Sequence, residues 1–450
     1  MDSSKKRMVI IGAGESGTGA AILAKDRGMD VFLSDSGKIS PHYREILERE
    51  GIAYEEGSHD LERILSADEI VKSPGVPFEA PVIKEVMSKH IPIVSEIELA
   101  GRYTNSKMVC ITGSNGKTTT TMLIHHILRH AGIDASLAGN IGKSLAWQVA
   151  RDPHKVYVVE LSSFQLDNMY DFKANIAVLL NITPDHLDRY DYEMQNYVNA
   201  KFRILRNMTP NDVFIFWQDD PVITEQLRHI TTEARLLPFA EHQEENSAAY
   251  IDAENELVFR TPGTNMKMPR ADLALNGLHN VFNSMAAGLS ACLFDLGKDD
   301  IREALADFTG VEHRLEFVAD IEGVRWINDS KATNVNSCWY ALEAMERPTV
   351  LILGGKDKGN DYSEILPLVQ RKVKAIVAMG LHNEKIVEFF SPHVKVVDTD
   401  NLDDAVSACR ELSESGDTVL LSPCCASFDL FKSYEDRGRR FKEKVLSLKN

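Results

Sequence analysis

Two glycine loops, each preceded by an apolar stretch, are the features of this sequence with the clearest chemical meaning. The first, "MVIIGAGESG" (8–17), spaces its glycines as G-x-G-x-x-G. The second, "MVCITGSNGKTTTT" (108–121), carries Lys-Thr directly after its last glycine. A glycine loop between a strand and a helix directs backbone N–H groups and the positive helix N-terminus toward phosphate. Both loops therefore predict phosphate binding.

The first loop is typical of a nucleotide site. Asp35 ends the next predicted strand, about 20 residues beyond the loop, where dinucleotide-binding enzymes place the acid that binds ribose. The pattern suits NAD and, to the same degree, some other nucleotide diphosphate. A purely structural turn is the weaker alternative.

The second loop resembles a Walker loop with two residues between its glycines instead of four. In such a loop, backbone N–H groups hold the phosphates, Lys117 neutralises them and the Thr118 hydroxyl reaches Mg²⁺. ATP binding is the favoured prediction. The alternative is a glycine turn without function ahead of a threonine-rich helix.

Two further side chains follow apolar strands and suit a metal or phosphate site. Glu160 ends "VYVVE" (156–160), the position of a metal-holding carboxylate beside a phosphate loop, although a solvated loop glutamate is the alternative. His186 lies in "NITPDHLDRY" (181–190) just past another strand. For this histidine a ligand role and a structural or exposed position are equally compatible with the sequence.

Lys201 lies on the apolar side of a predicted helix. Helical spacing in "YVNAKFRIL" (197–205) aligns Lys201 with Val198, Phe202 and Leu205. Such a lysine either extends its ammonium group to solvent or is desolvated, which lowers its pKa. A neutral amine can add CO₂ to form a carbamate, an anionic metal ligand. Spacing alone favours the first alternative.

The composition excludes several classes of protein. The 450-residue chain is 44% hydrophobic and 26% charged, with a formal charge of −17, which argues against non-specific nucleic-acid binding and requires local cations for an acidic substrate. We expect neither a signal peptide nor a membrane helix, because the first residues lead directly into a strand and glycine loop and no apolar run reaches about 18 residues. The six cysteines form no C-x-x-C pair, so we expect buried, reduced thiols in a cytoplasmic enzyme.

The elements that must position these side chains alternate between short β-branched strands and helical stretches, which predicts parallel α/β sheets. This pattern restarts twice, giving three predicted domains, 1–97, 98–310 and 311–450. Glycine or proline after most strands places loops at the strands' C-terminal ends, where open α/β sheets bind ligands. The polar stretch 240–270 predicts a hairpin excursion from the middle domain.

The order of the motifs resembles that of the Mur ligases along all three segments. The matching stretches are GSNGKT, ELSSFQLD, NITPDHLDRY, the lysine of YVNAKFR, NGLHNVFN (276–283), HRLE (313–316), NDSKATN (328–334) and SPCCASFD (422–429). The resemblance implies an N-terminal Rossmann-like domain that binds UDP, a central P-loop ATPase-like domain with a mainly parallel sheet, and a C-terminal Rossmann-like domain. In the family the first loop thus holds UDP rather than NAD, and the second holds ATP.

The resemblance also implies an activity. SSFQL and SPCCASFD are typical of members that add D-glutamate to UDP-N-acetylmuramoyl-L-alanine during cytoplasmic synthesis of peptidoglycan precursors. ATP phosphorylates the L-alanyl carboxylate, and the D-glutamate amine attacks the acyl phosphate through a tetrahedral intermediate. The implied cofactors are two Mg²⁺ ions and a CO₂-derived carbamate on Lys201, which reverses the interpretation from spacing. The implied enzyme is a monomer that binds neither nucleic acid nor membrane.

The resemblance assigns roles residue by residue. The implied catalytic residues are Lys117, His186, Lys201 and Lys331. The implied metal ligands are Thr118, Glu160, His186 and carbamylated Lys201. The implied ATP contacts are Gly113, Ser114, Asn115, Gly116, Lys117, Thr118, Thr119, Asn280, Arg314, Asp329 and Lys331. The implied UDP-sugar contacts are Gly14, Glu15, Ser16, Asp35, Ser36, Ser73, Gly75, Asn140, Ser162 and His186. The implied D-glutamate contacts are Thr333, Lys358, Ser427, Phe428 and Tyr434.

Two departures from the family pattern affect the uridine side. Ser36 and Gly37, followed by Lys38, stand where several relatives have Thr-Arg. Glu15 lies beside the diphosphate loop, and we expect its side chain to point away from the ligand. Three alternatives remain at this point: an NAD-dependent dehydrogenase, an ATP-gated binding protein without ligase activity, and a sister ligase for another amino acid. The Lys-Thr loop disfavours the first, and SSFQL disfavours the last.

Overall fold

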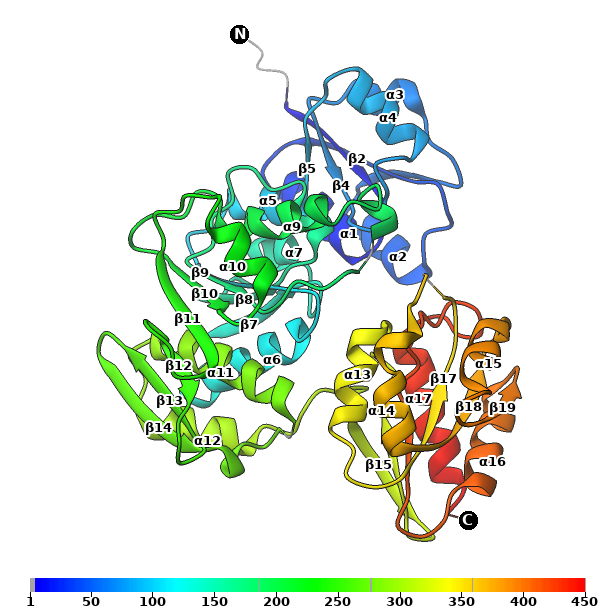
Figure 1. Cartoon of the computed structure of the whole chain (residues 1–450). Coiled ribbons are helices and arrows are strands. Elements are labelled where there is room, and N and C mark those ends of the chain that lie inside the picture. Colours follow the sequence, from blue (N-terminus) through cyan, green and yellow to red (C-terminus); the bar gives the residue numbers. More distant parts are fainter. Residues whose placement is uncertain (1–4, 186, 276, 358, 450) are drawn as a thin grey trace. The chain divides into compact units, whose positions relative to one another are not determined.

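The computed structural model describes residues 5–185, 187–275, 277–357 and 359–449. The chain forms two compact units. The first comprises Met1–Leu273 with Phe282–Phe308, and the second comprises Ala274–Val281 with Thr309–Asn450. The described residues form three sheets, two in the first unit and one in the second (Figure 1).

The N-terminal sheet is fully parallel, in the order β3-β2-β1-β4-β5. Its central strand β1 is apolar and almost wholly buried, as expected for a parallel strand covered on both faces. The strands are β1 (Arg7–Ile11), β2 (Asp30–Asp35), β3 (Ala53–Glu56), β4 (Glu69–Lys72) and β5 (Ile93–Val94). The helices are α1 (Glu15–Asp26), α2 (Pro41–Arg49), α3 (Leu61–Leu65), α4 (Pro81–Ser88) and α5 (Glu96–Gly101).

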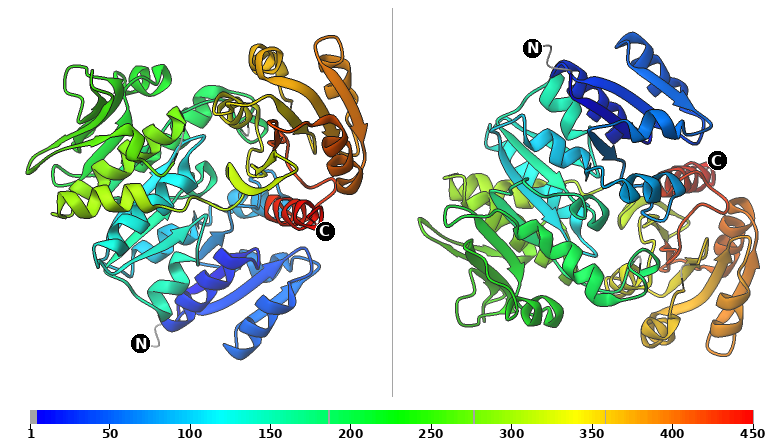
Figure 2. Two further views of the ribbon diagram at one scale, coloured as in Figure 1. Left: turned by 90° about the horizontal axis from the view of Figure 1, so that it is seen from below. Right: turned by 90° about the horizontal axis from the view of Figure 1, so that it is seen from above.

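The central sheet has the order β14-β13-β12-β11-β10-β9-β6-β8-β7. It is parallel from β7 to β12, whereas β12, β13 and β14 pair antiparallel and form its outer end (Figures 1 and 2). The predicted hairpin excursion within 240–270 is therefore confirmed. The strands are β6 (Lys107–Thr112), β7 (Ala135–Gly139), β8 (Val156–Glu160), β9 (Ile176–Leu179), β10 (Val213–Trp217), β11 (Arg235–His242), β12 (Ala249–Ile251), β13 (Glu256–Thr261) and β14 (Thr264–Pro269).

Helices follow most of the parallel strands of the central sheet, as βα units require. They are α6 (Lys117–His130), α7 (Leu145–Arg151), α8 (Ser163–Leu166), α9 (Met194–Phe202), α10 (Pro221–Leu227), α11 (Leu278–Cys292) and α12 (Lys298–Asp307). Short 3₁₀ helices cover Leu187–Arg189, Arg203–Leu205 and Arg270–Asp272.

The sheet of the second unit has the order β15-β16-β20-β17-β18-β19 and is parallel except for the β15–β16 pair. The strands are β15 (Glu316–Ile321), β16 (Val324–Asn328), β17 (Thr349–Leu353), β18 (Val373–Met379), β19 (Lys395–Thr399) and β20 (Thr418–Leu421). The helices are α13 (Val335–Glu343), α14 (Leu366–Lys372), α15 (Glu384–Phe390), α16 (Leu402–Leu412) and α17 (Tyr434–Ser447), with a 3₁₀ turn at Tyr362–Glu364. The expected three α/β sheets are thus present.

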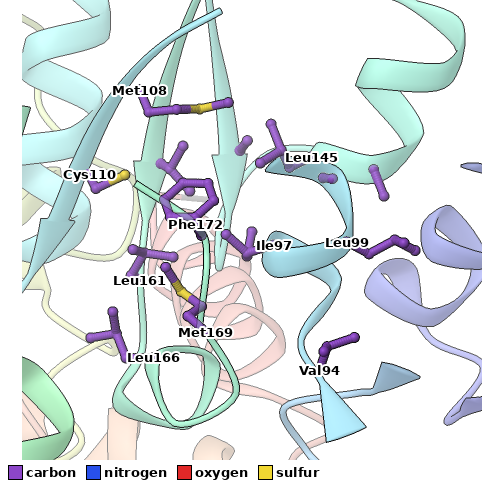
Figure 3. Packing of buried hydrophobic residues seen from close by; sticks show 14 of the residues in the cluster. Val94, Ile97, Leu99, Met108, Cys110, Leu145, Leu161, Leu166, Met169 and Phe172 are labelled. Carbon is purple, nitrogen blue, oxygen red and sulfur yellow. The ribbon is translucent and has the colours of Figure 1, made fainter. Parts of the chain in front are cut away.

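One hydrophobic core joins both sheets of the first unit. Figure 3 shows Met108 and Cys110 of β6 near Ile97 and Leu99 of α5 and Leu145 of α7, all of them buried. Helices α1, α5 and α7 pack against one another within this core. The six cysteines are buried and free, as expected. Among the described residues, no helix combines the length and the apolar character needed to cross a bilayer.

Candidate active site

The first glycine loop joins β1 to α1, and two of its glycines, Gly12 and Gly17, pack closely against neighbouring protein atoms. Gly12 has φ of +100°, and a Cβ added at Gly17 would stand 1.8 Å from the Gly12 carbonyl oxygen. The Ser73 hydroxyl donates to the same oxygen at 3.2 Å. Nothing lies within 4 Å of the Cβ position of Gly14. The loop is therefore open at the glycine where a diphosphate would approach the backbone.

Asp35 shapes this loop directly. One of its carboxylate oxygens accepts the backbone N–H of Ala13 at 2.8 Å, and the other accepts that of Gly37 at 2.8 Å. Ser73 lies on the loop after β4, against the same glycine turn. The structure thus brings together Asp35, Ser73 and the Gly14 loop, which sequence reasoning had assigned to one ligand.

Glu15 and Glu96 connect this loop to the central domain. Glu15 accepts the backbone N–H of Ser144 at 2.9 Å and the Tyr43 hydroxyl at 3.3 Å. Glu96 accepts the Ser144 hydroxyl at 2.8 Å and the backbone N–H of Ala146 at 2.5 Å. Both carboxylates therefore hold the start of α7. The expectation that the Glu15 side chain points away from a ligand stays a prediction.

The second loop, 113–116, joins β6 to α6, and two lysines bind one of its carbonyl groups. The Nζ atom of Lys117 donates to the carbonyl oxygens of Gly113 and Ser114, both at 2.8 Å. The Nζ atom of Lys201 donates to the Gly113 oxygen at 2.7 Å. Positive φ angles at Gly113 (+151°) and Gly116 (+83°) permit this turn. Lys201 is thereby held beside the phosphate loop.

Lys201 is 1% exposed, so the alternative that its ammonium group extends to solvent is wrong. Its predicted neighbours Val198, Phe202 and Leu205 are also buried. Burial lowers the pKa of Lys201 well below its usual value, and the charge of Lys117 lowers it further, against the attraction of Asp185. A neutral amine is the form that reacts with CO₂.

Glu160 ends β8 and is 1% exposed, so the alternative of a solvated loop glutamate is wrong. Its Oε1 atom accepts the Asn140 side-chain amide at 2.9 Å. Its Oε2 atom is buried and has no hydrogen-bond partner among the described residues. A buried carboxylate oxygen left without a partner beside a phosphate loop fits a bound cation. Thr118, the other oxygen ligand expected on this side, is buried in the first turn of α6.

Two of the expected ATP contacts, Ser114 and Asn115, bond to the segment that follows β9. The Ser114 hydroxyl donates to the Thr183 carbonyl at 2.8 Å, and Asn115 receives a hydrogen bond from the Asn181 side chain. Ser162 caps α8: its hydroxyl accepts the backbone N–H of Gln165, and the Gln165 side-chain oxygen accepts the backbone N–H of Ser162. His186 lies outside the described residues.

In the second unit, Asp329 directly follows β16 and its backbone N–H donates to Leu421 at the end of β20. Asp329 accepts the backbone N–H of Leu315 at 3.2 Å and the Ser422 hydroxyl at 2.8 Å. Burial raises the pKa of Asp329 to about 6, although the nearby Arg314 charge and the Ser422 hydrogen bond lower it. Arg314 retains a buried Nε atom without a partner among the described residues.

Lys331 and Tyr434 form a second group there. The Nζ atom of Lys331 donates to the Tyr434 hydroxyl at 3.2 Å and lies 5.0 Å from the centre of its ring. Asn280 follows His279, whose ring packs on Tyr340 and whose pKa falls to about 3 through burial and the charge of Arg314. Asn280 and Arg314 therefore belong to one neighbourhood of this unit.

The loops expected to bind D-glutamate are linked by backbone pairing. Lys356 and Ala426 exchange N–H···O bonds of 2.8 and 3.2 Å, which joins the loop after β17 to the loop carrying Ser427 and Phe428. Phe428 is 69% exposed, whereas Ser427 is buried. Thr333 lies two residues after Lys331 and bonds to its carbonyl. Lys358 lies outside the described residues.

Arg437 is a residue that sequence reasoning missed. It is 1% exposed and donates to the carbonyl oxygens of Ser330 and Cys425 at 2.8 to 3.1 Å and to the Ser330 hydroxyl at 2.9 Å. It thus ties α17 to the loops that carry Lys331 and Ser427. No local motif predicts this role, because Ser330, one of its partners, lies more than a hundred residues away in the sequence.

Three family models match consecutive parts of the chain. "Mur ligase MurD-like, N-terminal domain" matches residues 6–95, "Mur ligase middle domain" matches 111–291, and "Mur ligase, glutamate ligase domain" matches 313–425. The chain belongs to the Mur ligase family. The resemblance drawn from the motif order is therefore confirmed, as is the expected three-part α/β architecture.

Close relatives of this Mur ligase share its full length. A protein of Bacteroides fragilis named UDP-N-acetylmuramoylalanine–D-glutamate ligase is 60% identical over 98% of this chain and 100% of its own. A Porphyromonas gingivalis protein of the same name is 56% identical over the whole of both chains.

Solved structures support the fold of this Mur ligase. UDP-N-acetylmuramate-alanine ligase MurC of Thermotoga maritima aligns with a TM-score of 0.63, 18% identity and coverage of 98% of this chain and 99% of that one. A pseudomurein peptide ligase type C of Methanothermus fervidus aligns with a TM-score of 0.60, 20% identity and coverage of 98% and 100%. At such identities the likeness concerns the fold alone.

Proposed function

We propose that this Mur ligase joins D-glutamate to UDP-N-acetylmuramoyl-L-alanine in an ATP-dependent reaction. The observation that carries the proposal is the 60% identity, over 98% of this chain and the whole of the other, to a protein named for this reaction. The chain keeps the parts that such chemistry needs, namely an open diphosphate loop, a Lys-Thr phosphate loop and a buried carboxylate beside it.

The proposed chemistry follows from the weak reactivity of a carboxylate. An oxygen of the L-alanyl carboxylate attacks the γ-phosphorus of ATP, and ADP leaves. The D-glutamate amine then attacks the acyl carbon, and phosphate leaves from the tetrahedral intermediate. Lys117 neutralises charge on the transferred phosphoryl group, since fixed cations in a site shielded from water stabilise such charge most strongly.

We propose that Thr118 and Glu160 hold one Mg²⁺, in agreement with the Glu160 oxygen that lacks a partner among the described residues. His186, together with a carbamate formed on Lys201, would hold a second Mg²⁺ ion. When bound, Mg²⁺ neutralises the phosphate oxygens and the charge that develops on them. Lys201 is buried and its pKa is lowered, which favours the neutral amine that a carbamate requires.

The proposed substrate contacts divide into three groups. For the UDP-sugar they are Gly14, Glu15, Ser16, Asp35, Ser36, Ser73, Gly75, Asn140, Ser162 and His186. For ATP they are residues 113–119, Asn280, Arg314, Asp329 and Lys331, and for D-glutamate they are Thr333, Lys358, Ser427, Phe428 and Tyr434. We propose domains at 1–97, 98–310 and 311–450, and a monomer that acts in the cytoplasm, where the six free thiols stay reduced.

The proposal is tested by phosphate release from ATP in the presence of UDP-N-acetylmuramoyl-L-alanine and a panel of amino acids. We expect release to require D-glutamate, and K117A to lower kcat roughly 10²- to 10³-fold through loss of one stabilising cation. Phosphate release that ignores D-glutamate but responds to L-lysine or L-alanine would overturn the proposal. Tight NADH binding without any ligated product would favour the dehydrogenase alternative.

A further inference from the structure

A group of potential metal ligands lies away from the two glycine loops, where α6 and α12 pack together (Figure 1). His126 and His130 are one helical turn apart on α6. Glu303 and Asp307 are one turn apart on α12. Residues four apart share a helix face, so two imidazoles of one helix meet two carboxylates of the other.

The ligand atoms have the spacing of a coordination shell. The His126 Nε2 atom lies 2.6 Å from an Asp307 oxygen, and the His130 Nε2 atom lies 3.6 Å from a Glu303 oxygen. One ligand atom each from His126, His130 and Asp307 lies within 4.8 Å of the other two. A tetrahedral ion with bonds of 2.0–2.1 Å places its ligands about 3.3 Å apart. His130 faces Glu303 with its Nε2 atom and Asp307 with its Nδ1 atom, at 3.9 Å, so a turn of this ring and a rotation of the Glu303 side chain would complete the shell.

The chemistry of this group selects the cation. Two imidazole nitrogens with carboxylate oxygens suit Zn²⁺, Ni²⁺ or Cu²⁺, whereas Mg²⁺ prefers an all-oxygen shell. The His126 and His130 side chains are 33% and 28% exposed, so an ion can reach them from solvent. Two separate ion pairs, His126 with Asp307 and His130 with Glu303, would not by themselves bring His130 to Asp307 as well, which its Nδ1 atom approaches to 3.9 Å.

A second group of potential ligands among the described residues, Glu312, His313 and Glu316, is by contrast poorly accessible to an ion. The His313 side chain is 6% exposed, and its Nδ1 atom lies 2.9 Å from the Asn328 side-chain amide. That histidine already has a structural partner, and its burial leaves little access for an ion.

We propose that His126, His130 and Asp307, with Glu303 as a fourth ligand, bind a divalent transition metal of the zinc class. The ion would cross-link α6 to α12 and so stabilise the first unit, because a cation that binds only the folded state shifts the unfolding equilibrium. Helix α6 begins at Lys117, roughly 14–20 Å from the histidines at 1.5 Å per residue. The site is thus distinct from the phosphate loop.

The test is titration of the metal-free full-length protein with ZnCl₂ by calorimetry and with CoCl₂ by visible absorption. Excess MgCl₂ is present throughout to fill oxygen-ligand sites. We expect one Zn²⁺ site, a Co²⁺ spectrum with nitrogen ligands, and a higher temperature of unfolding with Zn²⁺. The double variant H126A/H130A should bind at least 100-fold more weakly, and E303Q should weaken binding less.

The matched control is H229A, because His229 faces the carboxylate of Glu225 at 3.0 Å and belongs to none of the potential metal-ligand groups in the described part of the chain. This variant should bind Zn²⁺ as the parent protein does. Should H126A/H130A fail to fold, D307N tests the same shell with both histidines in place and should weaken binding at least tenfold. Absence of a Zn²⁺ site, or equal affinity in the parent protein and the variants that fold, would overturn the proposal.

Discussion

Two lysines donate to the Gly113 carbonyl, and their surroundings favour different protonation states. Lys117 has a second carbonyl partner in Ser114, whereas Lys201 is enclosed and has Gly113 as its hydrogen-bond partner. Two full positive charges on one oxygen repel each other. The buried lysine therefore loses its proton more readily, which agrees with the lowered pKa of Lys201.

We expect K201A to lower ligase kcat roughly 10²- to 10³-fold, because it removes the group proposed to carry an anionic carbamate. Added formate or acetate should restore part of the activity by supplying a carboxylate to the space left by the side chain. The measurement is phosphate release with and without the added acid, and K117A serves as the control that short acids should not rescue. Equal failure of rescue in both variants would count against the carbamate.

Arg437 has a role in stability that differs from those of the lysines. We expect R437M to lower the free energy of unfolding by about 3–5 kcal/mol, because the carbonyl groups of Ser330 and Cys425 lose their donor in a buried setting. Urea unfolding measures this change. The neighbouring variant R439A removes an exposed arginine from Asp436, which keeps its bonds to Arg440 and to the Lys432 N–H, and should change stability by less than about 0.5 kcal/mol. Equal effects in the two variants would contradict the assignment.

At the scale of elements, the start of α7 is fixed by acids from the N-terminal domain. Ser144 caps α7 through its hydroxyl, while Glu15 and Glu96 accept its own N–H and O–H groups. Glu96 is fully enclosed and its Oε2 atom has no partner among the described residues. Burial raises the pKa of Glu96 to about 7, even though its two hydrogen bonds favour ionisation.

This raised pKa has a definite consequence for stability. Between pH 4.5 and about 7 the folded state keeps a proton on Glu96 that the unfolded chain has lost, so stability falls as pH rises through this window. At about 1.4 kcal/mol per pKa unit, the loss reaches about 3 kcal/mol above pH 7.

We expect E96Q to match the parent protein at pH 4.5 and to be more stable by up to that amount at pH 8. Urea unfolding across this range measures it, with the exposed Glu62 as control in E62Q. A constant difference between E96Q and the parent protein would contradict the expectation.

The elements that local patterns could predict are those whose signal lies within a few residues. Apolar strands followed by glycines predicted the two glycine turns, and the end of an apolar strand placed Glu160. Helical spacing placed Lys201 on a buried face but left its exposure open, because spacing does not tell whether a long side chain reaches solvent. The Glu96–Ser144 and Arg437–Ser330 bonds join residues 48 and 107 apart. Such pairings depend on the tertiary fold, so no local pattern predicts them.

At the scale of the whole molecule, a strongly acidic chain handles anionic groups with a few enclosed cations. The formal charge of −17 repels an anionic substrate at long range. Lys117 in the first unit, and Arg314, Lys331 and Arg437 in the second, are at least partly buried, and buried charges act at short range with little screening by salt. Each unit thus supplies its own local positive charge.

The two units also have separate hydrophobic cores. Those of the first unit include one around β6 and α7 and one between the N-terminal sheet and helices α3 and α4, and those of the second unit lie on the two faces of its sheet. Each unit is therefore expected to unfold as its own cooperative transition, since cooperativity follows the contiguous core. Calorimetric scans of the full chain should resolve two transitions, with E96Q at pH 8 raising the temperature of one and R437M lowering that of the other. At about 2–4 °C per kcal/mol for units of this size, the shifts are roughly 6–12 °C and 6–20 °C. A single transition that both variants move together would show that the two units unfold as one.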